Sequence, residues 1–419
     1  MKLDINKELH GLFILKGKSY SGIIVFSPNN SVKIVITTTT NNCIFEKNFR
    51  GMKISRIIGS IKEENVKITI IDGFVFESLW SSNGILEYTI FSNMVIFGEN
   101  IKKRIINIHN LHLMVPLLNK YIGNRLEKAR FNISEKIVDF SIKYENIINE
   151  FTLPKYELKV ILKSFFNIDK YDLRNKFEVE QFSPIILEFE KPKEIYESMK
   201  YVFTIEAFFS FIFQRDCFIN EIVYFKEGKT NLFNHIYIKH QEGKNIEKIN
   251  SMLFDKNYLI NNISKLIANW IHITNEIKYL RYFMLYFFEN KYIDQRIVAQ
   301  VNLIEALHRH YFGDKKDDKE IEIRNKRIIS QIKDEEDKIF ISNILKEKSN
   351  YGIRRKINDI SLKSNLKKLT KKEIDSIVKI RSILSHGSVY ENIDIEQFDD
   401  LSKKLNKIIN NIIKQELEK

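Results

Sequence analysis

The distribution of proline constrains this chain more than any other feature of its sequence. All five prolines lie in its first half, at Pro28, Pro116, Pro154, Pro184 and Pro192. Nine of the 14 glycines also precede residue 130. Because proline interrupts helices and glycine weakens them, the second half is free to be helical and the first half is not. We therefore expect an α+β multidomain chain that is β-rich at first and all-α afterwards.

The N-terminal region has the sequence pattern of short antiparallel strands. Segments 20–27 and 32–38 are rich in β-branched residues and flank the turn sequence Pro-Asn-Asn-Ser, which is typical of a hairpin. Similar runs continue to about residue 100 and predict a sandwich or barrel. Beyond them the pattern is mixed, with further strands and one helix at 195–213. We expect residues 1–250 to form a β-rich sensor or regulatory domain, mixed α/β after about residue 100.

From about residue 256 onward, apolar residues recur at helical spacing. Segments 257–290, 294–312, 327–348 and 394–417 each carry an apolar face that must be covered. Several amphipathic helices joined by short loops are typical of an antiparallel bundle. The sequence therefore predicts an all-α helical bundle over residues 256–419.

The overall charge and the cysteine count limit the class of partner and the compartment. The net charge is +13 and the pI is about 9.3, which favours an anionic partner such as nucleic acid. An A+T-rich genome, which favours lysine codons, would give the same charge without any function.

The two cysteines, Cys43 and Cys217, form no CxxC motif and fit a reducing cytoplasm. The first residues are too charged for a signal peptide, and the apolar run 201–213 is too short for a membrane span.

One late helix is predicted to carry an arginine on its apolar face. Thr370 and Glu373 form a capping box, which marks a helix start. The apolar face that follows is made by Ile374, Ile377, Val378 and Leu384. Arg381 falls within this face, and because a buried guanidinium stays charged it needs an anion. That anion is either a bound phosphate or a core carboxylate, for which Glu305 is a candidate.

His386 follows Arg381 by five residues, and Gly387 is placed to end the helix there. The negative end of a helix favours the protonated imidazole, which suits a general acid near neutral pH. An exposed histidine without a function would have the same sequence context. The spacing itself is weak evidence, since 15 arginines and nine histidines give roughly one such pair by chance. Arg104 and His109 have the same spacing, but no helix cap or stop surrounds them.

A basic cluster precedes this helix end. Residues 351–381 contain ten Lys or Arg and three Asp or Glu, a local net charge of +7. Such a cluster fits an RNA cleft, although a solvated lysine-rich face has the same composition. The candidate RNA-binding residues are Arg354, Arg355, Lys356, Lys367, Lys368, Lys371 and Lys372.

Arg381 and His386, separated by four residues near the end of a late helix, resemble the catalytic pair of the HEPN superfamily of ribonucleases. The order of the β-rich region, the segment 184–212, "NLIEALHRHYF" and "RSILSHG" is similar to the ApeA-like branch. Ser382 stands where many members carry Asn, Asp or His, and with Glu305 it is a candidate supporting residue.

The resemblance implies metal-independent and cofactor-free cleavage of RNA, with tRNA as a candidate substrate, by attack of the ribose 2′-OH. It also implies a homodimer or higher homo-oligomer, with a composite site formed by two protomers. The implied role is anti-phage defence by abortive infection, with a phage protein as a candidate trigger. In this chemistry His386 moves a proton and Arg381 stabilises the charged phosphate.

The sequence also offers other candidate sites and functions. Glu305 and His308 form an E-x-x-H motif, half of a di-iron signature, but the sequence contains no second copy, so we expect no metal. The main alternative function is a non-catalytic HEPN-like module for RNA binding or dimerisation, with a ligand-sensing β domain. A carbohydrate- or peptide-binding sandwich with a helical oligomerisation tail is a third class. Cleavage of RNA in EDTA would distinguish the first class from the others.

Overall fold

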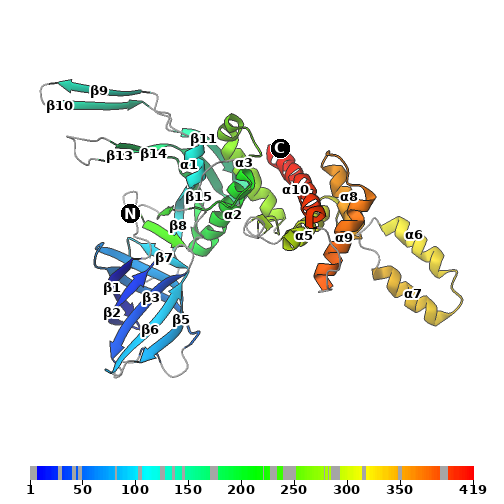
Figure 1. Ribbon diagram of the computed structural model, residues 1–419, viewed down its shortest axis with the longest axis horizontal. Coiled ribbons are helices and arrows are strands. Elements are labelled where there is room, and N and C mark those ends of the chain that lie inside the picture. The colour runs from blue at the N-terminus through cyan, green and yellow to red at the C-terminus, as the bar shows by residue number, and fades with distance from the viewer. Residues whose placement is uncertain are drawn as a thin grey trace. The chain divides into compact units, whose positions relative to one another are not determined.

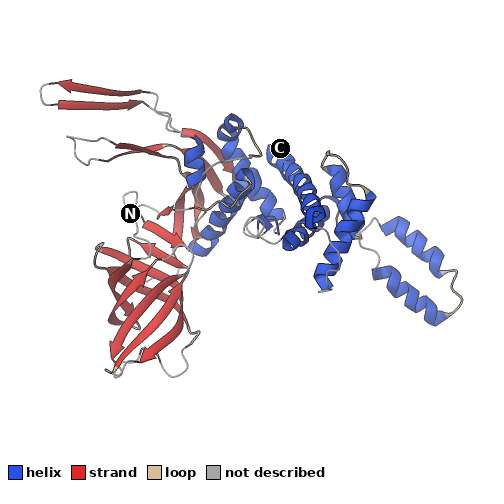
Figure 2. Cartoon of the chain, viewed as in Figure 1, coloured by secondary structure: helices blue, strands red, loops and turns tan. Residues whose placement is uncertain are grey.

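The computed structural model describes the chain except for several short segments. The described residues are 7–26, 31–39, 44–45, 50–80, 83–101, 106–122, 128–134, 137–143, 147–169, 178–219, 221–226, 234–238, 252–277, 279–281, 283–284, 293–313, 318–347, 352–386 and 395–419. Two units divide the chain, which we call unit 1 (Met1–Phe209 and Cys217–Ala268) and unit 2 (Ser210–Asp216 and Asn269–Lys419). Strands dominate unit 1 and helices dominate unit 2 (Figure 2). The domain limits predicted from the sequence, residues 1–250 and 256–419, stay a prediction.

Unit 1 begins with a closed six-stranded antiparallel barrel, drawn in blue in Figure 1. Its strands are β1 (Glu8–Leu15), β2 (Lys18–Val25), β3 (Val32–Thr39), β4 (Lys53–Ile61), β5 (Val66–Trp80) and β6 (Ile85–Ser92). They run in the order β5-β4-β1-β2-β3-β6, and pairing of β5 with β6 closes the barrel. Inward-facing residues alternate with outward-facing ones, as the period of two predicts. The predicted sandwich or barrel is therefore a barrel.

The barrel interior is packed around Phe13, which is fully buried. Gly22 lies beside this ring, and a Cβ at that position would approach the backbone oxygen of Val35 to 2.3 Å. A glycine is therefore needed there for β2 and β3 to pair closely.

Strand β5 is long enough to join the barrel to a second stretch of sheet. Its first half pairs with β7 (Met94–Phe97), and its second half pairs with β6. The sheet then continues through β17 (Asn234–Ile238), β16 (Glu221–Phe225), β8 (Asn107–Met114), β15 (Ile185–Glu194), β12 (Leu158–Lys163) and β11 (Ile147–Leu153). Two separate hairpins are formed by β9 (Lys128–Ser134) with β10 (Ile137–Lys143) and by β13 (Phe165–Asp169) with β14 (Glu178–Phe182). The remaining elements that begin in this unit are α1 (Pro116–Ile122), a 3₁₀ turn (Pro154–Tyr156), α2 (Ile195–Phe213) and α3 (Lys256–Glu276).

Unit 2 is helical, which confirms the predicted order of a β-rich region followed by a helical bundle. Its helices are α5 (Ile293–Phe312), α6 (Asp318–Ile329), α7 (Glu335–Glu347), α8 (Ile353–Lys363), α9 (Lys371–His386) and α10 (Ile395–Glu418). Helices α5, α8, α9 and α10 pack on one another. Buried Gln300 and Ser402 bond to each other, with Gln300 Nε2 donating to the Ser402 carbonyl at 3.0 Å, and so fix α5 on α10.

The single helix expected over 327–348 is wrong, because the chain turns inside it. Helix α6 ends at Ile329 and α7 begins at Glu335. Asp334 caps the new helix, since its Oδ1 accepts the backbone N–H groups of Glu336 at 2.8 Å and Asp337 at 3.0 Å.

Within the part of the chain that the structure describes, no helix has the length and apolarity required to cross a membrane.

Candidate active site

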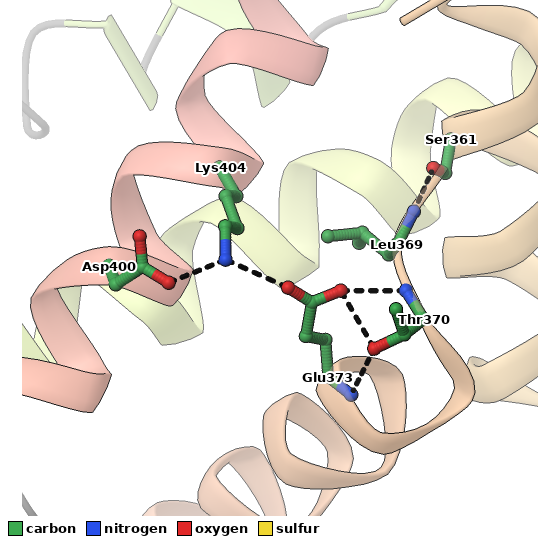
Figure 3. Close-up of polar contacts among 6 residues, drawn as sticks. All are labelled: Ser361, Leu369, Thr370, Glu373, Asp400 and Lys404. Carbon is green, nitrogen blue, oxygen red and sulfur yellow. Dashed lines mark hydrogen bonds and ion pairs between the residues drawn. The ribbon is translucent and has the colours of Figure 1, made fainter. Parts of the chain in front are cut away.

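Helix α9 begins where its sequence predicts, at a capping box (Figure 3). The Thr370 backbone N–H donates to Glu373 Oε2 at 2.6 Å, and the Glu373 N–H donates to the Thr370 hydroxyl at 3.3 Å. Lys404 reaches from α10 to Glu373 Oε1 at 2.8 Å. Hydrogen bonds from Lys404 and from the Thr370 backbone lower the pKa of Glu373 from 4.5 to about 2. The start of α9 is therefore bound to α10 by a carboxylate that stays ionised.

The turn between α8 and α9 is also held by hydrogen bonds. The hydroxyl of buried Ser361 accepts the Leu369 N–H at 3.2 Å, and the Ser364 hydroxyl donates to the Ser361 carbonyl at 2.7 Å. Asn411 on α10 donates to the Ser364 carbonyl. This turn adopts a defined conformation even though its tip, residues 365–368, is exposed.

Arg381 lies at the edge of the buried face of α9 and not within it. Ile374, Ile377 and Ile380 are the buried positions, whereas the Arg381 side chain is 36% exposed. The residue before Arg381, Ile380, belongs to the buried face, so Arg381 is its neighbour at the edge of that face. The expectation of a fully buried arginine is corrected accordingly.

The expected partner of Arg381 is present. Arg381 Nη2 lies 3.5 Å from Glu305 Oε2 on α5, and Lys356 Nζ on α8 donates to Glu305 Oε1 at 3.2 Å. One carboxylate thus holds two cations from two other helices. Arg381 Nε is buried and has no hydrogen-bond partner among the described residues. A buried donor of this kind costs free energy until an acceptor arrives.

His386, the second residue of the predicted Arg381–His386 pair, lies at the end of α9. Its side chain and Gly387 lie outside the described part of the structure. Ser382 is exposed on the same helix. Arg104, the arginine of the rejected pair, also lies outside the described residues.

His308 on α5 and Asp359 on α8 form a second polar contact, one helical turn after Glu305 and Lys356 on the same two helices. His308 Nε2 is 3.3 Å from Asp359 Oδ2, and Arg355 Nε donates to the same oxygen at 2.9 Å. His308 is fully buried, and this burial lowers its pKa although Asp359 acts in the opposite direction. Glu305 and His308 therefore contact different partners. Among the described residues, no cluster of three or more His, Cys, Asp or Glu is placed to hold a metal ion.

The predicted basic residues divide into two groups. Arg354, Arg355 and Lys356 on α8 pair with Asp375, Asp359 and Glu305, respectively. The other four are exposed at the turn before α9 and in its first residues, and have no carboxylate partner among the described residues. We call these four the lysine quartet: Lys367, Lys368, Lys371 and Lys372.

Two residues of this site were not singled out as functional from sequence. Asp359 was missed because its partner His308 is distant in sequence; its position four residues after Arg355 was the only local signal. Lys404 was missed for the same reason, since Glu373 lies on another helix.

The folds and the site together define a protein with a barrel-containing N-terminal region and a HEPN-type helical domain. The family model for ApeA N-terminal domain 1 matches residues 8–270, and the model for Apea-like HEPN matches residues 298–418. The chain therefore belongs to the ApeA-like HEPN proteins. Arg381, Glu305 and Lys356 all fall within the HEPN match.

Curated proteins and solved structures give no further information about the family. No curated protein matches the chain. Among solved structures, MrkH, described as a c-di-GMP-dependent transcription regulatory factor, matches with 10% identity over 46% of this chain and 80% of that chain. The TM-score of this match is 0.15, which is too low to support any structural argument.

Proposed function

We propose that this protein is a metal-independent endoribonuclease of anti-phage defence that acts by abortive infection. Membership of the ApeA-like HEPN family, a family of defence nucleases, supports the general class. The observation that carries the proposal is Arg381, a half-exposed arginine held by Glu305 five residues before the histidine that ends α9. An arginine in this position can contact both a protein carboxylate and a phosphate from solvent.

The proposed reaction is transfer within the RNA backbone. The ribose 2′-oxygen attacks the adjacent phosphorus, the new O2′–P bond forms, and the P–O5′ bond breaks. The 2′-OH proton is taken up by a base, and the 5′-oxygen receives a proton, with His386 serving one of these two transfers. Arg381 offsets the charge that accumulates on the phosphate oxygens. The products carry a 2′,3′-cyclic phosphate and a 5′-hydroxyl, and DNA is spared because it lacks the 2′-OH.

Glu305 acts in this scheme as a positioning residue. It pairs with Arg381 and with Lys356, and these two contacts support a role in restraining the guanidinium. Ser382, the exposed residue that follows Arg381, is proposed as a supporting residue of the same site. The lysine quartet supplies positive charge for the RNA backbone.

The site is proposed to be shared by two protomers. On one continuous helix, side chains five residues apart point about 140° apart, so a single Arg381–His386 pair is a poor site and two pairs facing across a two-fold axis are a better one. Structured RNA such as host tRNA is the proposed substrate, and a phage protein is the proposed trigger.

The test is cleavage of RNA in the presence of EDTA, with analysis of the product ends. Wild-type protein should produce 2′,3′-cyclic phosphate and 5′-hydroxyl ends, and Arg381→Ala and His386→Ala should each abolish cleavage and phage protection. Arg104→Ala is the control, because Arg104 has the same spacing to His109. If His386→Ala protein cleaves like wild type, the assignment is wrong. RNA that is bound but left intact by wild-type protein would instead support a non-catalytic module.

A further inference from the structure

A row of outward-facing residues crosses four strands of the unit 1 barrel near one end. Lys33 on β3 is directly opposite Phe91 on β6, Phe91 is opposite Phe74 on β5, and Phe74 is opposite Lys53 on β4. Directly opposed residues of neighbouring strands share one face of a sheet. The row therefore has a lysine at each end and two aromatic rings between them, and spans roughly 14 Å, three strand spacings of about 4.8 Å.

A third aromatic ring joins the row at an irregularity in β5. The register between β5 and β6 shifts at Phe76, which places this residue beside the row. Its ring centroid lies 5.4 Å from that of Phe91 in a T-shaped contact, and the ring centroid of Phe74 lies 5.8 Å from that of Phe91. Phe91 is half-buried, whereas Phe74 and Phe76 are 37% and 42% exposed. Phe91 thus supports two rings whose surfaces remain open to solvent.

Among the described residues, no carboxylate pairs with the cations that surround these rings. The guanidinium carbon of Arg50 lies 5.7 Å from the centroid of Phe76, and backbone bonding of Gly51 to Val75 fixes this segment against β5. Arg50, Lys33 and Lys53 are exposed and form no ion pair with another described residue.

We propose that this face of the barrel binds single-stranded nucleic acid. Bases stack on Phe74 and Phe76, and the backbone phosphates contact Lys33, Arg50 and Lys53. Exposed aromatic rings interleaved with cations are the pattern by which proteins hold single strands without reading their sequence. A duplex does not fit this pattern, because its base faces are already stacked on one another. A purely apolar partner does not fit either, since both ends of the row are cationic.

The experiment measures binding of a fluorescein-labelled 20-nucleotide oligo(dT) to the full-length protein by fluorescence anisotropy. This probe lacks the 2′-OH, so its binding is independent of the proposed ribonuclease reaction. The double variant Phe74→Leu/Phe76→Leu keeps apolar bulk but removes the stacking faces, and should weaken binding by about tenfold or more. Phe151→Leu is the matched control, because Phe151 is also 37% exposed in unit 1; it should bind like wild type.

Charge is tested separately from stacking. Lys33→Met/Lys53→Met should weaken binding and reduce the slope of log affinity against log salt by about 1.4, roughly 0.7 for each lost phosphate contact. Lys67→Met, which removes an exposed lysine elsewhere on β5, should leave the slope unchanged. The proposal is overturned if wild-type protein does not bind oligo(dT), if the double leucine variant binds as tightly as Phe151→Leu, or if these variants alter binding only to vesicles of anionic lipid. A thermal melt by circular dichroism confirms that each variant is folded.

Discussion

The ion pair between Glu373 and Lys404 should be a principal support of the helix that carries Arg381 and His386. Glu373→Gln is the informative change, because glutamine can still accept the Thr370 N–H and complete the capping box. The substitution therefore removes the charge while keeping the cap. Figure 3 shows that this charge faces Lys404 on α10, which is itself held by Asp400.

The magnitude follows from the pKa and the exposure of the pair. The pKa of Glu373 falls from 4.5 to about 2, which at about 1.4 kcal/mol per unit gives an upper bound of roughly 3.5 kcal/mol. The side chains of Glu373 and Lys404 are 24% and 41% exposed, so solvent screening reduces this value. We expect Glu373→Gln to lower the free energy of unfolding of unit 2 by about 1 to 2 kcal/mol.

Urea denaturation followed by tryptophan fluorescence measures this loss through a tryptophan that lies in unit 2. The chain has two tryptophans, and Trp80→Phe leaves only Trp270, which is fully buried in unit 2 and stacked on Phe211. Asp399→Asn is the matched control, because its exposed pair with Lys403 lies within α10 and, being screened by solvent, should contribute much less.

The pH dependence gives an independent check. A carboxyl group whose pKa is lowered by folding stabilises the folded state above its unfolded-state pKa, here near 4.5, and this stabilisation disappears as the pH falls towards 2. The difference in stability between wild type and Glu373→Gln should therefore be constant near pH 7 and shrink below about pH 4.5. A loss no larger than that of Asp399→Asn, or a difference that does not change with pH, would refute the reasoning.

Three further predictions concern the proposed activity. Glu305→Gln should lower the rate constant of RNA cleavage about fivefold and change RNA affinity little, since it releases Arg381 from a partly exposed pair of about 1 kcal/mol. An unchanged rate constant in single-turnover assays would contradict a positioning role. Asp375→Asn, which frees the exposed Arg354, is the control. Replacing the lysine quartet with glutamate should weaken RNA binding and flatten its salt dependence without moving the cleavage point; an unchanged salt slope in filter-binding assays would make the quartet a solvated face only. Sedimentation velocity should show a homodimer, and a strictly monomeric protein with full nuclease activity would exclude the shared site but leave the Arg381–His386 chemistry intact.

Local signals in the sequence were sufficient for the elements that carry the site. The capping box at Thr370 and Glu373 predicted the start of α9, and the helix predicted at 195–213 is α2 from end to end. The order of a β-rich region and a helical region followed from where proline and glycine occur, whereas the choice between a sandwich and a barrel stayed open. Such features depend on neighbouring residues, so they are visible without the tertiary structure.

Contacts between helices could not be predicted in the same way. Asp359 meets His308 across 51 positions of sequence, and no local pattern encodes that approach. The contact of Lys356 with Glu305 depends on the packing of α5 on α8 and has no local signal either. Its predicted contact with RNA stays a prediction. The division of α6 from α7 was missed because the residues around Asp334 have the spacing of a continuous helix. In the structure Asp334 caps the start of α7 instead.

The corrected position of Arg381 bears directly on the proposed function. An arginine enclosed in the apolar face of α9 would need either a phosphate that enters the core or a carboxylate beside it, and pairing with a carboxylate there would leave it little access to RNA. At the edge of that face, one side of the guanidinium meets Glu305 while part of the side chain stays exposed. The carboxylate limits the movement of the cation, which lowers the entropic cost of placing it against a transition state. A half-exposed, paired arginine therefore supports the proposed role better than the buried one that the sequence pattern predicts.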